Sequence, residues 1–177
     1  MTAAAAQPAQ QQVRTSVATD FDHWRHLVAE SFVPLLAFAF RHVFNRTNER
    51  VAEVTAGKSG LRALRAFCLE VLPLDEERIN EARIVIPFWQ KAINDDEKAA
   101  IHLSSMGQWH SMILGYLAQA RESGDVATPV PDGTIADQLL NMLLGAQIAA
   151  ALAPRRQAAA DLVDQVDGYL TLLGAAA

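Results

Sequence analysis

The sequence predicts an all-α protein, and three observations lead to this prediction. Glycine is scarce, with nine residues in 177 and the first at Gly57, so the opening third of the chain lacks a frequent helix breaker. Alanine is abundant, and β-branched residues do not alternate with polar ones as they do in strands. Apolar residues instead recur every three or four positions, which is the spacing of one helix face.

Length and composition indicate one soluble domain with a hydrophobic core, since 51% of the residues are hydrophobic and 20% are charged. The net charge of −5 argues against binding nucleic acid over the whole surface. The charge is uneven, with +3 over residues 1–65 and −8 over residues 66–177. Either a partner at the basic end or a solvated helix face explains this asymmetry.

The single cysteine, Cys68, has apolar neighbours at helical spacing, so we interpret it as a small core residue. One cysteine cannot form an internal disulfide, which favours a reducing cytoplasm. No apolar run approaches the ~20 residues of a membrane span, and no signal peptide is recognised. The sequence therefore predicts a cytoplasmic protein without a membrane segment.

The N-terminal third is expected to contain a tail and two helices. Residues 1–13 are rich in Ala and Gln and are predicted to be a disordered tail. Residues 14–34 are predicted to contain an atypical helix that Asp20 caps and Pro34 ends. A second helix is predicted over 35–54, and a loop follows over 55–60.

Three turn signals delimit the central helices. A helix over 61–72 ends at Pro73, and Asp75 is expected to cap the next helix. Pro87 should kink that helix, and a further helix starts at Asn94 or Asp95 and runs through residue 122. The predicted buried stripe of the helix that contains Pro87 consists of Ile79, Ala82, Ile86, Trp89 and Ile93.

Two helices are predicted to close the chain, over 134–152 and 155–173, with Pro154 between them. The first of them is apolar over more than one face, whereas a surface helix needs an apolar stripe of only about 100°. The additional apolar surface is most commonly buried against a second copy of the chain, related by a two-fold axis.

Several of these pieces together resemble a known family. They are Leu61-Arg62-Ala63-Leu64, the run Leu69-Glu-Val-Leu-Pro-Leu-Asp-Glu-Glu-Arg78, Phe88-Trp89, and the closing helix pair. In this order they resemble the C-terminal domain of TetR-family transcriptional regulators, in the branch similar to the choline-responsive repressor BetI. The resemblance covers roughly residues 35–175, and the domain is expected to span 35–177.

The resemblance implies a bundle of about six to seven helices that serves transcription regulation, as a rule repression. It implies no cofactor. It also implies a homodimer formed by the last two helices. The residues expected at that interface are Ile135, Leu139, Leu143, Gln147, Leu162, Val166, Tyr169, Leu170 and Leu173.

The resemblance further implies a small effector enclosed among the central helices, whose binding alters the spacing of two DNA-reading heads. The residues expected to line its pocket are Phe67, Phe88, Trp89, His102, Met106, Trp109, His110, Ile113, Gln138 and Met142, with Asn141 beside them. Each aromatic residue alone is more often plain core than ligand contact, but the group favours a cavity. The aromatic content suits an apolar effector or, by cation–π attraction, a cationic one.

The N-terminal part departs from the family pattern. A TetR-type regulator begins with a helix-turn-helix head of about fifty residues, and its usual sequence signals are not found before residue 35. An intact head is therefore not expected, and direct DNA binding is doubtful. Residues 14–34 instead resemble the start of the sensing region of some AraC-type regulators, from which no function is transferred. A fusion, a degraded regulator and a mis-assigned gene start are all compatible with this pattern.

Other candidate sites have weak patterns. His23, His26 and Glu30 share one helix face, but a solvated face explains them better than a metal site. His102 and His110 are eight residues apart without ligand companions, so no metal site is predicted. Gly57-Lys58-Ser59 lacks the rest of a phosphate-binding loop, and the serines near the histidines lack a nucleophile elbow.

The sequence thus predicts the effector-binding and dimerisation domain of a TetR-type regulator. The first alternative is a stand-alone helical protein that forms heterodimers with intact regulators. The second is a small helical enzyme, which would need convergent ionisable side chains, and none stands out.

Overall fold

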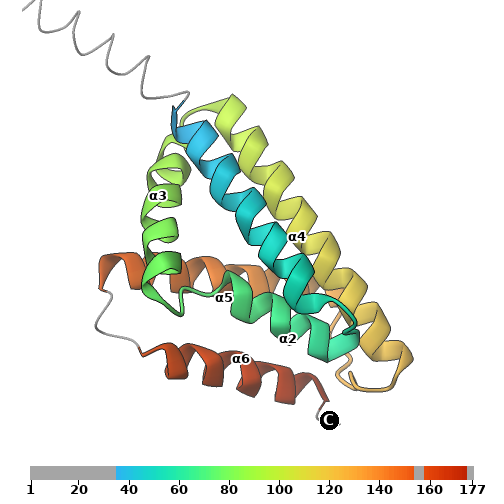
Figure 1. The fold of residues 1–177 in the computed structure, drawn as a ribbon. Helices are drawn as coiled ribbons and strands as arrows, with labels where there is room; N and C mark the ends of the chain where they lie inside the picture. Colours follow the sequence, from blue (N-terminus) through green and yellow to red (C-terminus); the bar gives the residue numbers. More distant parts are fainter. Residues whose placement is uncertain (1–34, 154–157, 175–177) are drawn as a thin grey trace, which may run out of the picture. The chain divides into compact units, whose positions relative to one another are not determined.

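The computed structural model of the chain describes residues 35–153 and 158–174. Within these ranges the backbone forms helices and no strand, so the all-α prediction is confirmed. The helices are one over 35–55, then α2 (Gly60–Val71), α3 (Glu76–Ala92), α4 (Asp96–Glu122), α5 (Asp132–Leu152) and α6 (Ala159–Gly174) (Figure 1).

The chain divides into two units, residues 1–38 and 39–177. The described residues 35–38 of the first unit are helical. The predicted tail over 1–13 and the predicted helix over 14–34 lie outside the described residues, as does the candidate metal group of His23, His26 and Glu30. The predicted boundary after residue 34 stays a prediction.

Local capping fixes where the central helices begin. The Asp75 carboxylate Oδ1 accepts a hydrogen bond from the Arg78 backbone N–H at 2.9 Å, and Asp95 Oδ1 accepts one from the Lys98 N–H at 3.1 Å. Each carboxylate therefore satisfies a first-turn donor and lies at the positive end of the helix dipole. Asp75 was the predicted cap, and Asp95 was one of the two residues predicted to start α4.

The buried face of α3 differs from the predicted stripe. Its buried residues are Ala82, Val85 and Phe88, whereas Ile93 is 78% exposed. Phe88 stacks on Phe40 of the helix over 39–55, with ring centroids 4.1 Å apart. Because this helix is apolar on several sides around Pro87, its tertiary partner selects which side is buried.

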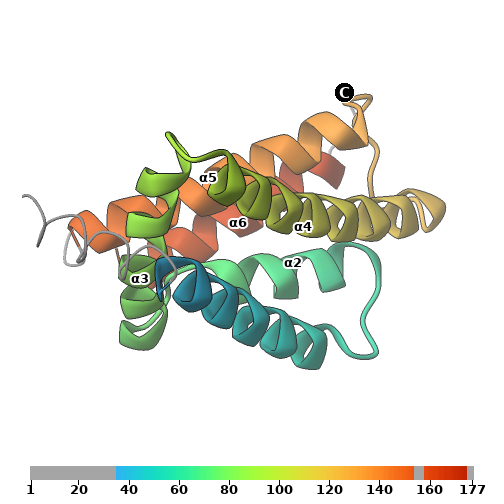
Figure 2. The ribbon, with the colours of Figure 1, turned by 90° about the horizontal axis from the view of Figure 1, so that it is seen from above.

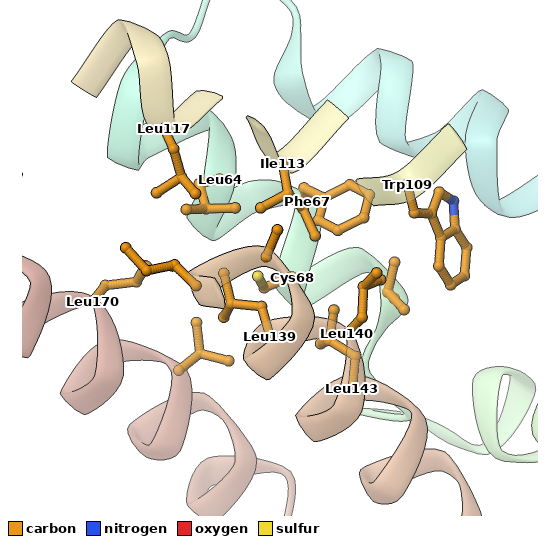
Figure 3. Packing of buried hydrophobic residues seen from close by; sticks show 14 of the residues in the cluster. Leu64, Phe67, Cys68, Trp109, Ile113, Leu117, Leu139, Leu140, Leu143 and Leu170 are labelled. Atoms are coloured by element: carbon orange, nitrogen blue, oxygen red, sulfur yellow. The ribbon is translucent and has the colours of Figure 1, made fainter. Parts of the chain in front are cut away.

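Helix α2 lies at the centre of the packing because it contacts α4, α5 and α6. Helix α4 runs along α2 and also contacts α3 and α5, and the view from above in Figure 2 separates α4 from the helix over 39–55. The fully buried side chains meet between these elements, as Figure 3 shows. They include Leu64, Phe67, Cys68, Ile113, Leu117, Leu139 and Leu143.

The start of α2 needs a glycine. Gly60 has φ +57°, and its N–H donates to Oε1 of Gln119 at 3.0 Å. A Cβ at Gly60 would lie 3.4 Å from the backbone of Ala120. The space is sufficient, so the positive φ is what favours glycine there.

One arginine organises the loop between α4 and α5. Arg121 donates to the Asp132 carboxylate at 2.6 Å and to the carbonyl oxygens of Thr128 and Val130 at 3.0 and 2.8 Å. These contacts fix where α5 starts, two residues before the predicted Thr134. In the middle of α2, Arg65 forms an ion pair with Asp167 of α6.

Helix α5 is long and apolar enough to cross a membrane by length and composition alone. This differs from the sequence-based prediction that no such segment exists. The same test is passed by core helices of soluble proteins, and Ile135, Leu139 and Leu143 of α5 lie fully buried in the core. We therefore interpret α5 as a core helix.

Candidate functional site

A pocket lies between the helix over 39–55, α2, α3 and α4. The space between its atoms is about 440 Å³, which includes the part open to solvent. Its lining consists of Phe40, Val43, Phe44, Thr47, Arg50, Glu70, Val71, Arg78, Glu81, Ala82, Val85, Trp89, Met106, Trp109 and Gln147. The pocket therefore draws on five helices, and Gln147 is the contribution of α5.

Aromatic rings form one side of the pocket. The Phe44 ring lies 6.0 Å from Phe40 and 5.1 Å from Trp109, between ring centroids. Trp109 also meets Phe67 edge-on at 5.9 Å, so the core supports it from behind. Aromatic pairs at these distances add to the stabilisation from burial. The result is an apolar wall between α4 and the helix over 39–55.

Trp109 is held in place by a hydrogen bond as well as by packing. Its indole Nε1–H donates to Oδ1 of Asn48 at 2.8 Å. A buried indole N–H needs such a partner, and this one comes from the neighbouring helix. Trp109 thus presents its ring to the pocket while its polar atom is satisfied elsewhere.

Charged side chains also line the pocket. Arg50 donates to both carboxylate oxygens of Glu81, at 3.0 and 2.9 Å, and its Nε donates to Glu70 at 2.6 Å. Arg78 donates to the second oxygen of Glu70 at 2.7 Å. We call Arg50, Glu70, Arg78 and Glu81 the charged wall. It links the helix over 39–55 to α2 and α3.

The charges within this wall compensate one another. The side-chain hydrogen bond to Glu81 raises the pKa of Arg50 most; burial opposes the rise, and the bond to Glu70 adds to it. Glu70 is 6% exposed and would be costly to bury without partners. Two arginines and two glutamates therefore form a neutral unit in which every carboxylate oxygen accepts a hydrogen bond.

Two polar atoms near the pocket are buried and have no hydrogen-bond partner among the described residues. They are Nε1 of Trp89, which lines the pocket, and Nδ1 of His102. The two rings come from α3 and α4 and meet edge to face, with centroids 6.2 Å apart. Burial lowers the pKa of His102 below its usual range.

The ten residues predicted for the pocket fall into three groups. Trp89, Met106 and Trp109 line the pocket. Phe67, Phe88 and Ile113 are fully buried in the core and are not part of the lining. His102 contacts Trp89 without being part of the lining.

The other predicted pocket residues lie away from the pocket. His110 Nε2 is 3.4 Å from Asp137 on α5. Gln138 is exposed and accepts a hydrogen bond from the Tyr169 hydroxyl at 2.6 Å, and Asn141 is exposed. Met142 packs against the core from α5. These positions place the pocket nearer the helix over 39–55 than the sequence suggested.

Most of the residues predicted for the dimer interface are buried within the chain itself. These residues are Ile135, Leu139, Leu143, Leu162, Val166, Leu170 and Leu173, and their place in a dimer interface stays a prediction. Of the remaining two, Gln147 lines the pocket and donates to the carbonyl oxygen of Val71 at 3.1 Å. Tyr169 is half-buried and bonds Gln138.

Sequence reasoning missed the charged wall. One signal was present, because Glu70 follows Ala63 and Phe67 on the buried face of α2. An acid at a core position needs a buried partner. The identity of that partner was not readable, since Arg50 and Glu81 are 20 and 11 residues away in the chain. Within the described residues, no cluster of three or more His, Cys, Asp and Glu is placed to hold a metal ion.

The comparisons with known proteins agree with this fold. Residues 61–175 match the family described as the C-terminal domain of BetI-type transcriptional repressors. Among curated proteins, none matches the chain in sequence.

Three solved structures are similar to the chain. A transcriptional regulator from Rhodococcus sp. Rha1 has 26% sequence identity and a TM-score of 0.67, over 78% of this chain and 70% of that one. A transcriptional regulator from Pseudomonas aeruginosa PAO1 has 20% identity and a TM-score of 0.66, over 79% and 68%. A TetR-family regulator from Rhodococcus sp. has 14% identity and a TM-score of 0.68, over 81% and 75%.

The last two likenesses show the shared fold, and the family match covers more than half of the chain. The chain therefore belongs to the TetR family of transcriptional regulators, and residues 61–175 are a C-terminal domain of the BetI type.

Proposed function

We propose that this chain binds a small effector molecule in the pocket between the helix over 39–55, α2, α3 and α4. The observation that carries the proposal is the composition of the lining, which combines aromatic rings with a charged wall whose members pair with one another. Apolar pockets with a few fixed polar groups are typical of small-molecule sites. Regulators of this family generally bind small effectors, which supports the proposal.

The proposed effect of the ligand is on the helix over 39–55. This helix supplies Phe40, Val43, Phe44, Thr47 and Arg50 to the lining, one side of its length. If the ligand binds more tightly when this helix is in one position than in another, binding shifts the equilibrium toward the first position. The size of the shift is set by the difference between the two affinities. Regulation of transcription follows in this proposal from the position of this helix.

The proposed action is binding without turnover. Glu70 and Glu81 are the carboxylates in the lining, and arginines hold both through hydrogen bonds. A general base must be available to take a proton from the substrate, and these acids are engaged in the charged wall. A cytoplasmic location accompanies the proposal, as for the soluble regulators of this family.

We also propose a homodimer formed by the exposed faces of α5 and α6. The exposed residues of α5 at helical spacing are Gln138, Asn141, Gly145, Ile148 and Leu152. Those of α6 are Gln165, Gly168 and Leu172. Glycine allows two helices to approach closely, and the exposed Ile148, Leu152 and Leu172 supply apolar area.

A thermal-shift screen of small aromatic and aliphatic compounds tests the effector proposal. A ligand at 100 times its Kd stabilises the fold by about 2.7 kcal/mol, which corresponds to roughly 5–10 °C in Tm for a chain of this size. Val43→Phe fills part of the pocket and should abolish the shift. The matched control is Asn45→Phe on the exposed side of the same helix, which should keep it. A shift that survives Val43→Phe would place binding elsewhere.

A further inference from the structure

One histidine contacts the pocket lining and has a buried nitrogen without a partner. His102 of α4 is half-buried, and its Nδ1 is buried with no hydrogen bond to any described residue. Its ring meets the ring of Trp89 edge to face, with centroids 6.2 Å apart. Trp89 comes from α3 and lines the pocket. His102 is therefore in contact with the pocket lining without being part of it.

The surroundings of this contact on α3 and α4 offer no counter-ion. One turn before His102 on α4, the Lys98 ammonium is bonded to the carboxylate of Asp95. The residues one turn to either side of Trp89 on α3 are all apolar, namely Val85, Ile86, Ala92 and Ile93. No described carboxylate forms an ion pair with His102, and burial is the cause that lowers the pKa of this residue.

The charged groups of the other helices packed on α4 are exposed or already paired. The basic residues of the helix over 39–55 are exposed or paired with glutamates of α2 and α3; they are Arg41, His42, Arg46 and Arg50. The acidic residues Glu49 and Glu53 of the same helix are exposed. On α5, the Asp137 carboxylate lies 3.4 Å from His110, two turns further along α4 than His102.

Protonation changes what the buried nitrogen requires. A neutral imidazole carries one N–H, whereas an imidazolium carries an N–H at each nitrogen. In the charged form, Nδ1 of His102 is therefore a buried donor without an acceptor, which is costly. A cation over the face of a tryptophan is attracted to the ring within about 6 Å. The separation of 6.2 Å from Trp89 is at the limit of that range.

We propose that His102 makes the α3–α4 side of the pocket sensitive to acid: when the imidazole takes up a proton, its contact with Trp89 weakens and this part of the lining opens. The proposal needs no ligand, so it is independent of the effector proposal. It adds a response to pH to a pocket whose lining is otherwise held by packing and by the charged wall.

The direction of the pH dependence follows from the two states of the chain. A histidine in an unfolded chain takes up its proton near pH 6.5, and burial lowers the pKa of His102 in the folded chain. Below about pH 6.5 the unfolded chain therefore binds more protons than the folded one. The stability of the fold is unaffected by this group above that pH, and it decreases as the pH falls through the folded-state pKa.

Hydrogen exchange of the indole N–H groups tests whether the lining opens. In a chain labelled with ¹⁵N-tryptophan, Trp24, Trp89 and Trp109 each give one indole signal, and Trp89→Phe identifies that of Trp89. Trp109 is the internal reference, because its N–H is bonded to Asn48. The ratio of the Trp89 exchange rate to the Trp109 rate should rise at least about threefold from pH 7.5 to pH 5.5. In His102→Phe, which cannot take up a proton, the ratio should change less than about twofold.

Thermal unfolding tests the sign of the effect on stability. The decrease in Tm from pH 7.5 to pH 5.5 should be at least about 2 °C larger in the wild-type chain than in His102→Phe. His110→Phe is the matched control, since His110 is also half-buried on α4 but lies by Asp137, and it should keep the wild-type decrease. His102→Gln, which also cannot take up a proton in this range, gives the same comparison if His102→Phe does not fold.

Three results would overturn the proposal. An NMR titration midpoint of the His102 ring above pH 6.5, identified with His102→Phe, would mean that the Trp89 ring attracts the cation. Equal decreases in Tm in the wild-type chain and in His102→Phe would assign the loss of stability to other groups. An exchange ratio that does not change with pH would mean that protonation leaves the pocket lining closed. None of these results bears on the Val43→Phe test of the effector pocket.

Discussion

Arg50 and Glu81 form a bidentate pair in which two guanidinium nitrogens donate to the two carboxylate oxygens at 3.0 and 2.9 Å. The residues are 31 positions apart in the chain and join the helix over 39–55 to α3. Bidentate pairs hold both partners in one geometry. Both residues also line the pocket. The same two side chains therefore form part of the pocket lining and join the two helices.

Loss of this link should destabilise the fold. Arg50→Met removes the partner of Glu81 and one partner of the buried Glu70, so we expect the free energy of unfolding to fall by about 3 kcal/mol. Arg46→Met is the matched control, because the Arg46–Glu77 pair lies on the same two helices but is exposed. Its loss should cost less than about 1 kcal/mol. Urea unfolding of both variants measures the difference, and equal losses would mean that the charged wall is not structural.

Cys68 should be unreactive in the folded chain. Its thiol is completely buried, and burial raises its pKa to about 12. The thiolate that attacks disulfide reagents is therefore scarce at pH 8. We expect less than one tenth of the protein to react with 5,5′-dithiobis(2-nitrobenzoate) in an hour at pH 8. The same reagent in 8 M urea should titrate one thiol per chain, and fast reaction without urea would show that the α2 core opens.

Replacing Gly60 or Gly107 with alanine should change the stability of the chain in opposite directions. Gly60 has φ +57°, so Gly60→Ala should cost roughly 1–2 kcal/mol of backbone strain. Gly107 lies inside α4, and a Cβ there would meet no atom within 4 Å. Gly107→Ala should therefore stabilise the chain by roughly 0.5–1 kcal/mol. Thermal unfolding compares the two, and a gain in stability from Gly60→Ala would contradict the positive φ at the start of α2.

The proposed dimer depends on the outer face of α5 and α6. Leu172→Asp on α6 places a charge on that face and should shift the chain from dimer to monomer in sedimentation velocity. Leu103→Asp on α4 is the control, since Leu103 is 69% exposed and Leu172 is 68% exposed in the single chain. A wild-type chain that sediments as a monomer at 100 μM, or a dimer that survives Leu172→Asp, would contradict the proposed interface.

Local signals predicted the helices well because their causes are local. Pro73 and Asp75 set the end of α2 and the start of α3, and Asp95 caps α4 through a backbone N–H three residues on. The predicted α5 began two residues late because Asp132 is held by Arg121, eleven positions earlier. The predicted start of α6 lies within residues 154–157, outside the described ranges.

Apolar residues at helical spacing serve two purposes that one sequence does not separate. Leu139, Leu143, Leu162 and Val166 have the pattern of a dimer seam, but the core of the chain uses the same pattern and buries them completely or nearly so. In α3 the apolar run around Pro87 offers several faces, and contact of Phe88 with Phe40 selects one. A single sequence does not encode which partner an apolar face will meet.

The sequence predicted part of the pocket lining. Trp89, Met106 and Trp109 were identified from the helices that such regulators use, and they line the pocket. No pattern in the sequence marks Phe40, Phe44 and Arg50 as lining residues. Their role depends on contacts with α3 and α4 that are more than 30 residues distant in sequence.

The most direct test of the effector pocket is an NMR titration of the chain with ¹³C-methyl-labelled methionine, using any compound that raises Tm in the thermal-shift screen. The chain has four methionines: Met1, Met106, Met112 and Met142. Met106 lines the pocket, whereas Met112 and Met142 pack against the core. We predict that the Met106 methyl signal, identified with Met106→Leu, moves on titration and that the signals of Met112 and Met142 stay nearly fixed. Movement of Met142 with a stationary Met106 would contradict the account and place the ligand between α4 and α5.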